Sequence, residues 1–130
     1  MFPARKPESE NVNVLIQYFG RSLGLFGLRD KDSSCFRIFI ELVKGAKSNR
    51  GVSSQELAYK LGLTRGTVVH HLNKLIDAGI VKSQQNRYSL RGTTLGEVVD
   101  YIEKDLQELI KNLKEVASQL DTQLNMRGSP

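Results

Sequence analysis

The sequence predicts a mainly α-helical fold that carries a small β-hairpin and ends in a long, coiled-coil-like helix. Three observations lead to this prediction. Apolar residues recur at helical spacing within residues 64–79, two short β-like segments flank a polar turn within residues 80–90, and apolar residues alternate by four and three positions from residue 95 to residue 120. The chain has 130 residues, 39% of them hydrophobic, and is therefore long enough to bury one core.

The stretch 64–79 predicts a helix with one buried face and one free face. The buried face comprises Val68, Leu72, Leu75 and Ile76. The free face lacks acidic residues and comprises Gly66, Thr67, His70, Asn73 and Lys74. Thr64 can accept a free backbone N–H at the helix start, and Gly79 suits the left-handed residue after the helix end. We therefore expect a helix from about Arg65 to Ala78.

A second, shorter helix is predicted just before this one. Ser53 and Glu56 have the spacing of a capping box, and Leu57 to Leu61 provide apolar positions one helical turn apart. Only residues 62–63 separate the two helices, so they must cross steeply, as in a helix-turn-helix. Downstream, residues 80–84 and 87–90 predict two short strands around a turn at residues 85–86.

Together these segments resemble a winged helix-turn-helix of the ArsR/MarR-like transcriptional regulators. The resemblance lies in VSSQELA at residues 52–58, LTRGTVVHHL at residues 63–72 and LIDAGIV at residues 75–81, and it covers roughly residues 32–91. It implies a sequence-specific regulator that binds double-stranded DNA as a homodimer, acts as a repressor, and inserts the helix 65–78 into the major groove. It also implies that Val52 adds a third short strand to the hairpin, which is the wing.

The resemblance and the pattern together name the candidate DNA contacts. In the recognition helix they are Thr64, Arg65, Gly66, Thr67, Val69, His70, Asn73 and Lys74. At the preceding helix start and in the wing they are Ser53, Ser54, Gln55, Lys82, Gln84, Gln85, Asn86 and Arg87. Arg65 suits a guanine or a phosphate, Asn73 an adenine, and Val69 a thymine methyl group.

Charge is segregated along the chain. Residues 44–91 contain nine Lys and Arg against two acidic residues, a local balance of +7, whereas residues 92–124 contain three against seven, a balance of −4. Positive charge concentrated on a motif that fits a groove favours DNA as the partner, because neutralised phosphates release counterions.

The region before the motif predicts a flexible arm at residues 1–10 and a helix over about residues 10–26, which belongs to the dimer layer. Gly20, Gly24 and Gly27 weaken the helix end, or let a helix of the second subunit approach closely. Asp32 or Ser33 is expected to cap the next helix, which ends near residue 45. We therefore expect one DNA-binding domain over residues 11–93, with its N-terminal helix at residues 11–27.

Residues 94–124 predict a long dimerisation helix of roughly 45 Å, followed by a tail at residues 125–130. A capping box at Thr94 and Glu97 starts it. The expected dimer seam is Leu95, Val99, Ile102, Leu106, Leu109, Leu113, Val116 and Leu120. The alternative is that the helix folds back on its own domain, since surface helices also carry apolar stripes.

The sequence holds little that suggests an enzyme, a cofactor or a metal site. Cys35 is the single cysteine and is expected to pack as a small hydrophobe, while His70 and His71 are neighbours and point about 100° apart on a helix. No apolar run reaches membrane-span length, so we expect a cytoplasmic, nucleoid-associated protein. Two alternatives stay open: a winged-helix protein-interaction module, or a non-specific chromatin-like DNA binder. The sequence does not identify a small-molecule effector.

Overall fold

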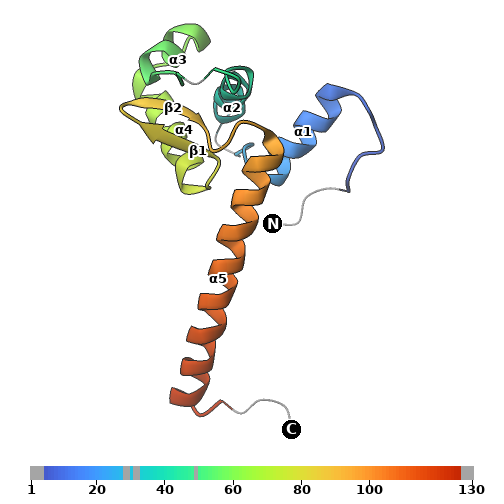
Figure 1. Cartoon of the computed structure of the whole chain (residues 1–130), viewed down its shortest axis with the longest axis vertical. Coiled ribbons are helices and arrows are strands. Elements are labelled where there is room, and N and C mark those ends of the chain that lie inside the picture. The colour runs from blue at the N-terminus through green and yellow to red at the C-terminus, as the bar shows by residue number, and fades with distance from the viewer. Residues whose placement is uncertain (1–4, 28–29, 31–32, 49, 127–130) are drawn as a thin grey trace.

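The computed structural model of the protein describes residues 5–27, 30, 33–48 and 50–126. The described elements are α1 (Val12–Ser22), α2 (Ser34–Lys44), α3 (Ser54–Leu61), α4 (Arg65–Asp77), β1 (Val81–Gln84), β2 (Arg87–Leu90) and α5 (Leu95–Gln123). Figure 1 shows α2, α3, α4 and the hairpin gathered into a head, with α1 beside it and α5 extending away from it. This is a winged helix-turn-helix with one additional helix at each end, as the sequence predicted.

The core lies where α4 packs against α2 and α3 and where the hairpin closes over them. Its most buried side chains come from all of these elements: Ile38, Phe39, Leu57, Val68, Leu72, Leu75, Ile80, Leu90 and Val98. Each such side chain contributes about 1.5–3 kcal/mol when it leaves water. The apolar face predicted for α4 is therefore the face that anchors it, and the opposite face stays free.

The predicted N-caps of three helices are confirmed. Ser53 Oγ accepts the N–H of Glu56 at 3.0 Å, and Thr64 Oγ1 accepts the N–H of Thr67 at 3.1 Å. Thr94 Oγ1 accepts the N–H of Glu97 at 3.1 Å. Each bond satisfies a backbone donor that the helix itself leaves free. These contacts span three residues, which is why a local pattern was sufficient to predict them.

The prediction that the Ser33 side chain caps α2 was wrong. Ser33 occupies the N-cap position but has a left-handed backbone with φ of 52° and makes no side-chain cap bond, and Asp32 lies outside the described residues. The carboxylate of Asp30 instead accepts the N–H groups of Ser34 and Cys35, both at 2.9 Å. The helix start is therefore capped by a carboxylate four residues before Ser34 and not by the residue at the N-cap position.

Helix α1 is shorter than the predicted span of residues 10–26 and ends at Ser22. Gly24 follows with φ of +76°, and the N–H of Leu25 bonds to the carbonyl of Gly20 at 2.9 Å, so the chain turns back on the helix. A Cβ at Gly20 would lie 2.6 Å from the Phe36 ring. This glycine therefore permits close approach of α2 within the same chain, and not of a second subunit as the spacing had suggested.

The hairpin is an antiparallel pair in the expected register, with Val81 opposite Leu90 and Gln84 opposite Arg87. Gln85 and Asn86 both have positive φ, 53° and 62°, as a tight two-residue hairpin turn requires. Val52 bridges to Tyr88 through N–H···O bonds of 2.9 and 2.7 Å. The third short strand of the wing is thus present as a single bridge.

Helix α5 does not fold back on its own domain. Its first turn is anchored by Val98, which is fully buried, whereas every residue from 103 to 123 is exposed. The helix has 29 residues and spans about 44 Å, and Figure 1 shows most of this length projecting beyond the head. Among the described residues, no helix combines the length and apolarity needed to cross a membrane.

Candidate nucleic-acid interface

The turn between α3 and α4 places the N-terminal half of α4 at the surface. Gly62 ends α3 with φ of +68°, and the N–H of Leu63 bonds to the carbonyl of Ala58 at 3.0 Å. Helices α2 and α3 cover one side of α4, while the start of α4 remains open. Free N–H groups and the helix dipole make such a start favourable for a phosphate.

The structure brings most of the candidate contacts of α4 to one open face. The exposed members are Thr64, Arg65, Gly66, His70, Asn73 and Lys74. Thr67 and Val69 are partly buried, and the hydroxyl of Thr67 accepts a 2.8 Å hydrogen bond from Thr64. Among the described residues, neither Arg65 nor Lys74 forms an ion pair with a carboxylate. The face is therefore basic, polar and available to an anionic partner.

The start of α3 offers fewer contacts than the sequence suggested. Gln55 is exposed, whereas Ser53 is partly buried and its hydroxyl serves as the cap described above. Ser54 is only 7% exposed, so its side chain cannot reach a DNA phosphate. The prediction that the Ser54 side chain contacts DNA is therefore corrected. Tyr59, which the sequence reading passed over, is 92% exposed on the same helix and is the most exposed large side chain there.

The wing presents Lys82, Gln84, Gln85 and Asn86 to solvent. Lys82 and Gln84 share one face of β1, because strand residues two apart point the same way. Tyr88 lies on the opposite face and packs against the core. The tip of the wing is therefore polar and basic, and no acidic residue occurs in the hairpin from residue 81 to residue 90.

Arg87 has a structural role that the sequence did not reveal. Its Nε donates to the carbonyl of Arg50 at 2.7 Å, and an Nη donates to the carbonyl of Gly51 at 2.9 Å. The same guanidinium lies 3.3 Å from the carboxylate of Glu56. Arg87 thus ties the wing to the α2–α3 loop and to α3, in addition to its predicted role as a DNA contact.

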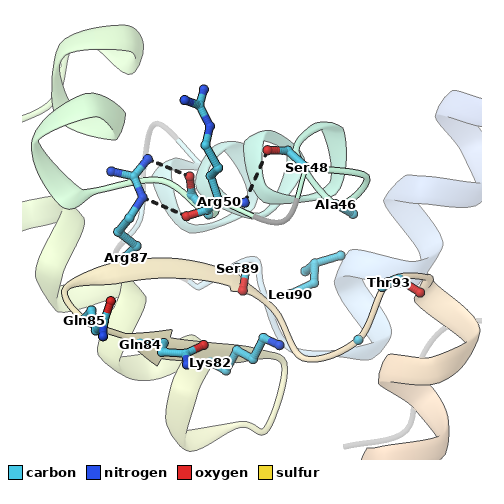
Figure 2. Close-up of a pocket in the computed structure, with 12 residues that line it drawn as sticks. Ala46, Ser48, Arg50, Lys82, Gln84, Gln85, Arg87, Ser89, Leu90 and Thr93 are labelled. Carbon is cyan, nitrogen blue, oxygen red and sulfur yellow. Dashed lines mark hydrogen bonds between the residues drawn. The ribbon is translucent and has the colours of Figure 1, made fainter.

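The outer side of the wing is hollowed by a pocket of about 350 Å³. Figure 2 shows the hairpin residues on one side, the loop with Ser48 and Arg50 on the other, and Thr93 at one end. No acidic residue lines it. The lining residues are Ala46, Ser48, Arg50, Gly51, Lys82, Gln84, Gln85, Arg87, Ser89, Leu90, Gly92 and Thr93.

A buried titratable cluster lies on the other side of α4, away from its open face. His71 is 7% exposed, and its Nε2 lies 3.9 Å from a carboxylate oxygen of Asp30. Burial lowers the pKa of His71, and the nearby Asp30 charge only partly opposes this. Burial also raises the pKa of the Cys35 thiol, so this cysteine packs as an apolar group, as predicted. Within the described ranges, no three His, Cys, Asp or Glu side chains are grouped so that they could hold a metal ion.

Comparison with known proteins found one family model that matches part of this chain. Residues 32–84 match the family model described as a helix-turn-helix domain, a range that spans α2, α3, α4 and β1. No curated protein and no solved structure was found to match the chain. The matched region contains the turn between α3 and α4 and the open face of α4 described above.

Proposed function

We propose that the protein is a sequence-specific, double-stranded DNA-binding transcriptional regulator that acts as a homodimeric repressor. The match of residues 32–84 to the helix-turn-helix family model supports this proposal. The observation that carries this proposal is the open face of α4. It is exposed and basic, it lacks acidic residues from residue 65 to residue 76, and it begins at a capped helix start.

In this proposal, α4 is the recognition helix. Its N-terminal half enters the major groove, where Arg65 addresses a guanine or a phosphate and Asn73 an adenine. Gly66 is exposed, and a Cβ at this position would meet no atom within 4 Å, so its absence leaves room for a base edge or phosphate and not for another part of the chain. Lys82, Gln85 and Asn86 of the wing contact the flanking backbone, and these contacts position the domain more than they select sequence.

The exposed stripe on α5 supports the homodimer. Its apolar side chains are each about half exposed, a state that costs free energy until a partner covers them: Val99, Leu106, Leu109, Ile110, Leu113, Val116 and Leu120. All of them except Ile110 belong to the series of residues 95–120 that alternates by four and three, the spacing at which two helices pack side chains into each other's gaps. A second copy of the chain carries the same stripe and is the simplest partner.

Helix α1 supports a wider dimer layer. Its inner face packs on the core through Ile16 and Phe19, while Val12 and Leu15 are 74% and 40% exposed. These outward residues can cover part of the α5 stripe of a second subunit. Residues 94–124 then form the dimerisation helix and residues 11–93 the DNA-binding domain, with two recognition helices spaced to read a roughly palindromic site.

Repression follows from occupancy, because a dimer bound across a promoter blocks access of other proteins to it. The test is to retain genomic DNA fragments on the purified protein at two salt concentrations and to sequence them. We expect enrichment of a short inverted repeat, with retention falling as salt rises. Retention without any motif would instead indicate a non-specific chromatin-like binder. An absence of retention at both salt concentrations would indicate a protein-interaction module.

A further inference from the structure

The pocket on the outer side of the wing is separate from the open face of α4. Side chains alternate along each strand, so Val81 and Leu90 point into the core, while Lys82, Gln84 and Ser89 point to the opposite face. Helix α4 packs on the core side of the hairpin. A molecule in the pocket therefore lies across the hairpin from the helix proposed to enter DNA.

The chemistry of the pocket suits a compact anion. Arg87 is held in place by two carbonyl groups at 2.7 and 2.9 Å, so this cation is already positioned at one end. Lys82 and Arg50 line the pocket and make no ion pair among the described residues. Glu56 offsets part of the charge of Arg87 from outside the lining, which leaves the positive balance to Lys82 and Arg50.

The neutral lining residues add hydrogen-bonding groups and a small apolar surface. Ser48, Ser89 and Thr93 provide hydroxyl groups, and Gln84 provides an amide. Figure 2 shows Lys82 and Ser89 on the hairpin side of the hollow and Leu90 near its centre. The volume of about 350 Å³ lies at the lower end of the size range of small-molecule sites, and the lining is more polar than is usual for such sites, which suits a polar ligand.

We propose that this pocket binds a small phosphorylated molecule, no larger than a nucleoside monophosphate. A phosphate group carries close to two negative charges and three acceptor oxygens, which matches two unpaired cations and several hydroxyl donors. A DNA backbone phosphate has the same chemistry. The free molecule is favoured because the pocket is a hollow, with Ser48 and Arg50 opposite Lys82 (Figure 2), so it can surround a small phosphate from two sides. Lys82, which we also place against the DNA backbone, is then shared between the two ligands.

Binding has an expected consequence for DNA, which rests on the proposed function. A bound phosphate places negative charge on the wing and next to Gly92 and Thr93, which immediately precede α5. Added negative charge beside the DNA interface weakens phosphate contacts. We therefore expect the phosphorylated molecule to lower DNA affinity.

Titration of the full-length, isotope-labelled protein with AMP and with inorganic pyrophosphate, at constant ionic strength, tests the site by NMR. We expect the amide signals of Gly51, Ser89 and Gly92 to shift and saturate. Lys82→Gln should raise the Kd about tenfold, the usual scale for one charge-assisted contact, and Ser89→Glu should abolish binding by placing an acid in the hollow. The control Lys104→Gln removes the same charge from exposed α5 and should leave the Kd unchanged.

Three outcomes would overturn the proposal. The first is that neither probe causes shifts that saturate. The second is that Lys82→Gln binds the probes with the same Kd as the native protein. The third is that no probe binds while Lys82→Gln weakens DNA binding. The last would assign the pocket to the DNA backbone. The titration needs no DNA, so a failure of DNA binding itself leaves its result intact. Anisotropy with a labelled duplex, with and without AMP, then measures the effect on DNA affinity, and Ser89→Glu serves as the insensitive control.

Discussion

His71 of α4 and Asp30 before α2 meet on the buried side of α4, with Nε2 of His71 3.9 Å from Oδ1 of Asp30. The same carboxylate accepts the backbone N–H groups of Ser34 and Cys35. The Nδ1 atom of His71 is buried and has no hydrogen-bond partner among the described residues. The carboxylate of Asp30 thus caps the start of α2 and lies near His71 of α4. Because both groups titrate, the stability of the domain depends on pH.

We predict that the protein loses stability as pH falls from 7 to 5. Burial lowers the pKa of His71, so below about 6.5 the unfolded chain binds more protons than the folded one, and protons favour unfolding. Urea unfolding at several pH values measures this. His71→Gln removes the titrating group and should flatten the dependence. An identical pH dependence in both proteins would exclude His71 as its source.

Asp30 is expected to contribute about 1–2 kcal/mol to folding, the usual value of a helix N-cap. Burial raises its pKa, but the N–H groups of Cys35 and Ser34 outweigh this and lower the pKa overall. The carboxylate therefore stays charged near neutral pH, and its contribution disappears only as pH falls through that lowered pKa. Asp30→Ala should lose this stability in urea unfolding, and Asp30→Asn, which keeps an acceptor oxygen, should lose less. Equal stability of both variants and the native protein would contradict the cap.

Arg65→Ala combined with His70→Ala should weaken specific DNA binding and leave the fold unchanged, because both side chains are exposed on α4. One base contact contributes about 1–3 kcal/mol, which corresponds to roughly 5- to 150-fold in Kd. Anisotropy with an operator duplex measures the loss, and circular dichroism checks the fold. Lys104→Ala removes one positive charge from α5 and is the control. Unchanged affinity of the double variant would reject α4 as the recognition helix.

Leu106→Asp combined with Leu113→Asp should convert the proposed dimer into a monomer. Both side chains are 53% exposed in the single chain and lie on the apolar stripe, where two buried carboxylates per subunit would oppose association. Light scattering coupled to size-exclusion chromatography measures the mass. Lys104→Asp combined with Lys111→Asp adds the same carboxylates to α5 outside the stripe and should preserve the dimer. A native dimer mass for the leucine variants would show that the stripe is not the interface.

Arg87→Ala should loosen the wing, because two backbone carbonyls lose a charged donor. The side chain is 40% exposed, so solvent reduces the effect to about 1–2 kcal/mol. Hydrogen exchange at the amides of Val52 and Tyr88, which bridge the wing to the core, should become faster. Lys82→Ala lacks such bonds and should leave this exchange unchanged. Equal exchange in both variants would mean that Arg87 does not anchor the wing.

The sequence by itself was sufficient for features that depend on near neighbours. The caps at Ser53, Thr64 and Thr94 join residues three apart, and the turn at residues 85–86 needs only two residues that tolerate positive φ. The buried face of α4 follows from helical periodicity alone. These interactions form within one or two turns of chain, so their partners can be read in order along the sequence.

Tertiary structure decided the features that join distant segments. Arg87 donates to carbonyls 36 and 37 residues away, and Gly20 meets the ring of Phe36 on another helix. His71 and Asp30, which lie 41 residues apart in the sequence, meet on the buried side of α4. The pocket beside the wing forms only when the α2–α3 loop lies over the hairpin. A backbone carbonyl or a charged side chain can bond to many chemically suitable partners in the sequence. The packing of the whole chain decides which of these partners lies within bonding distance.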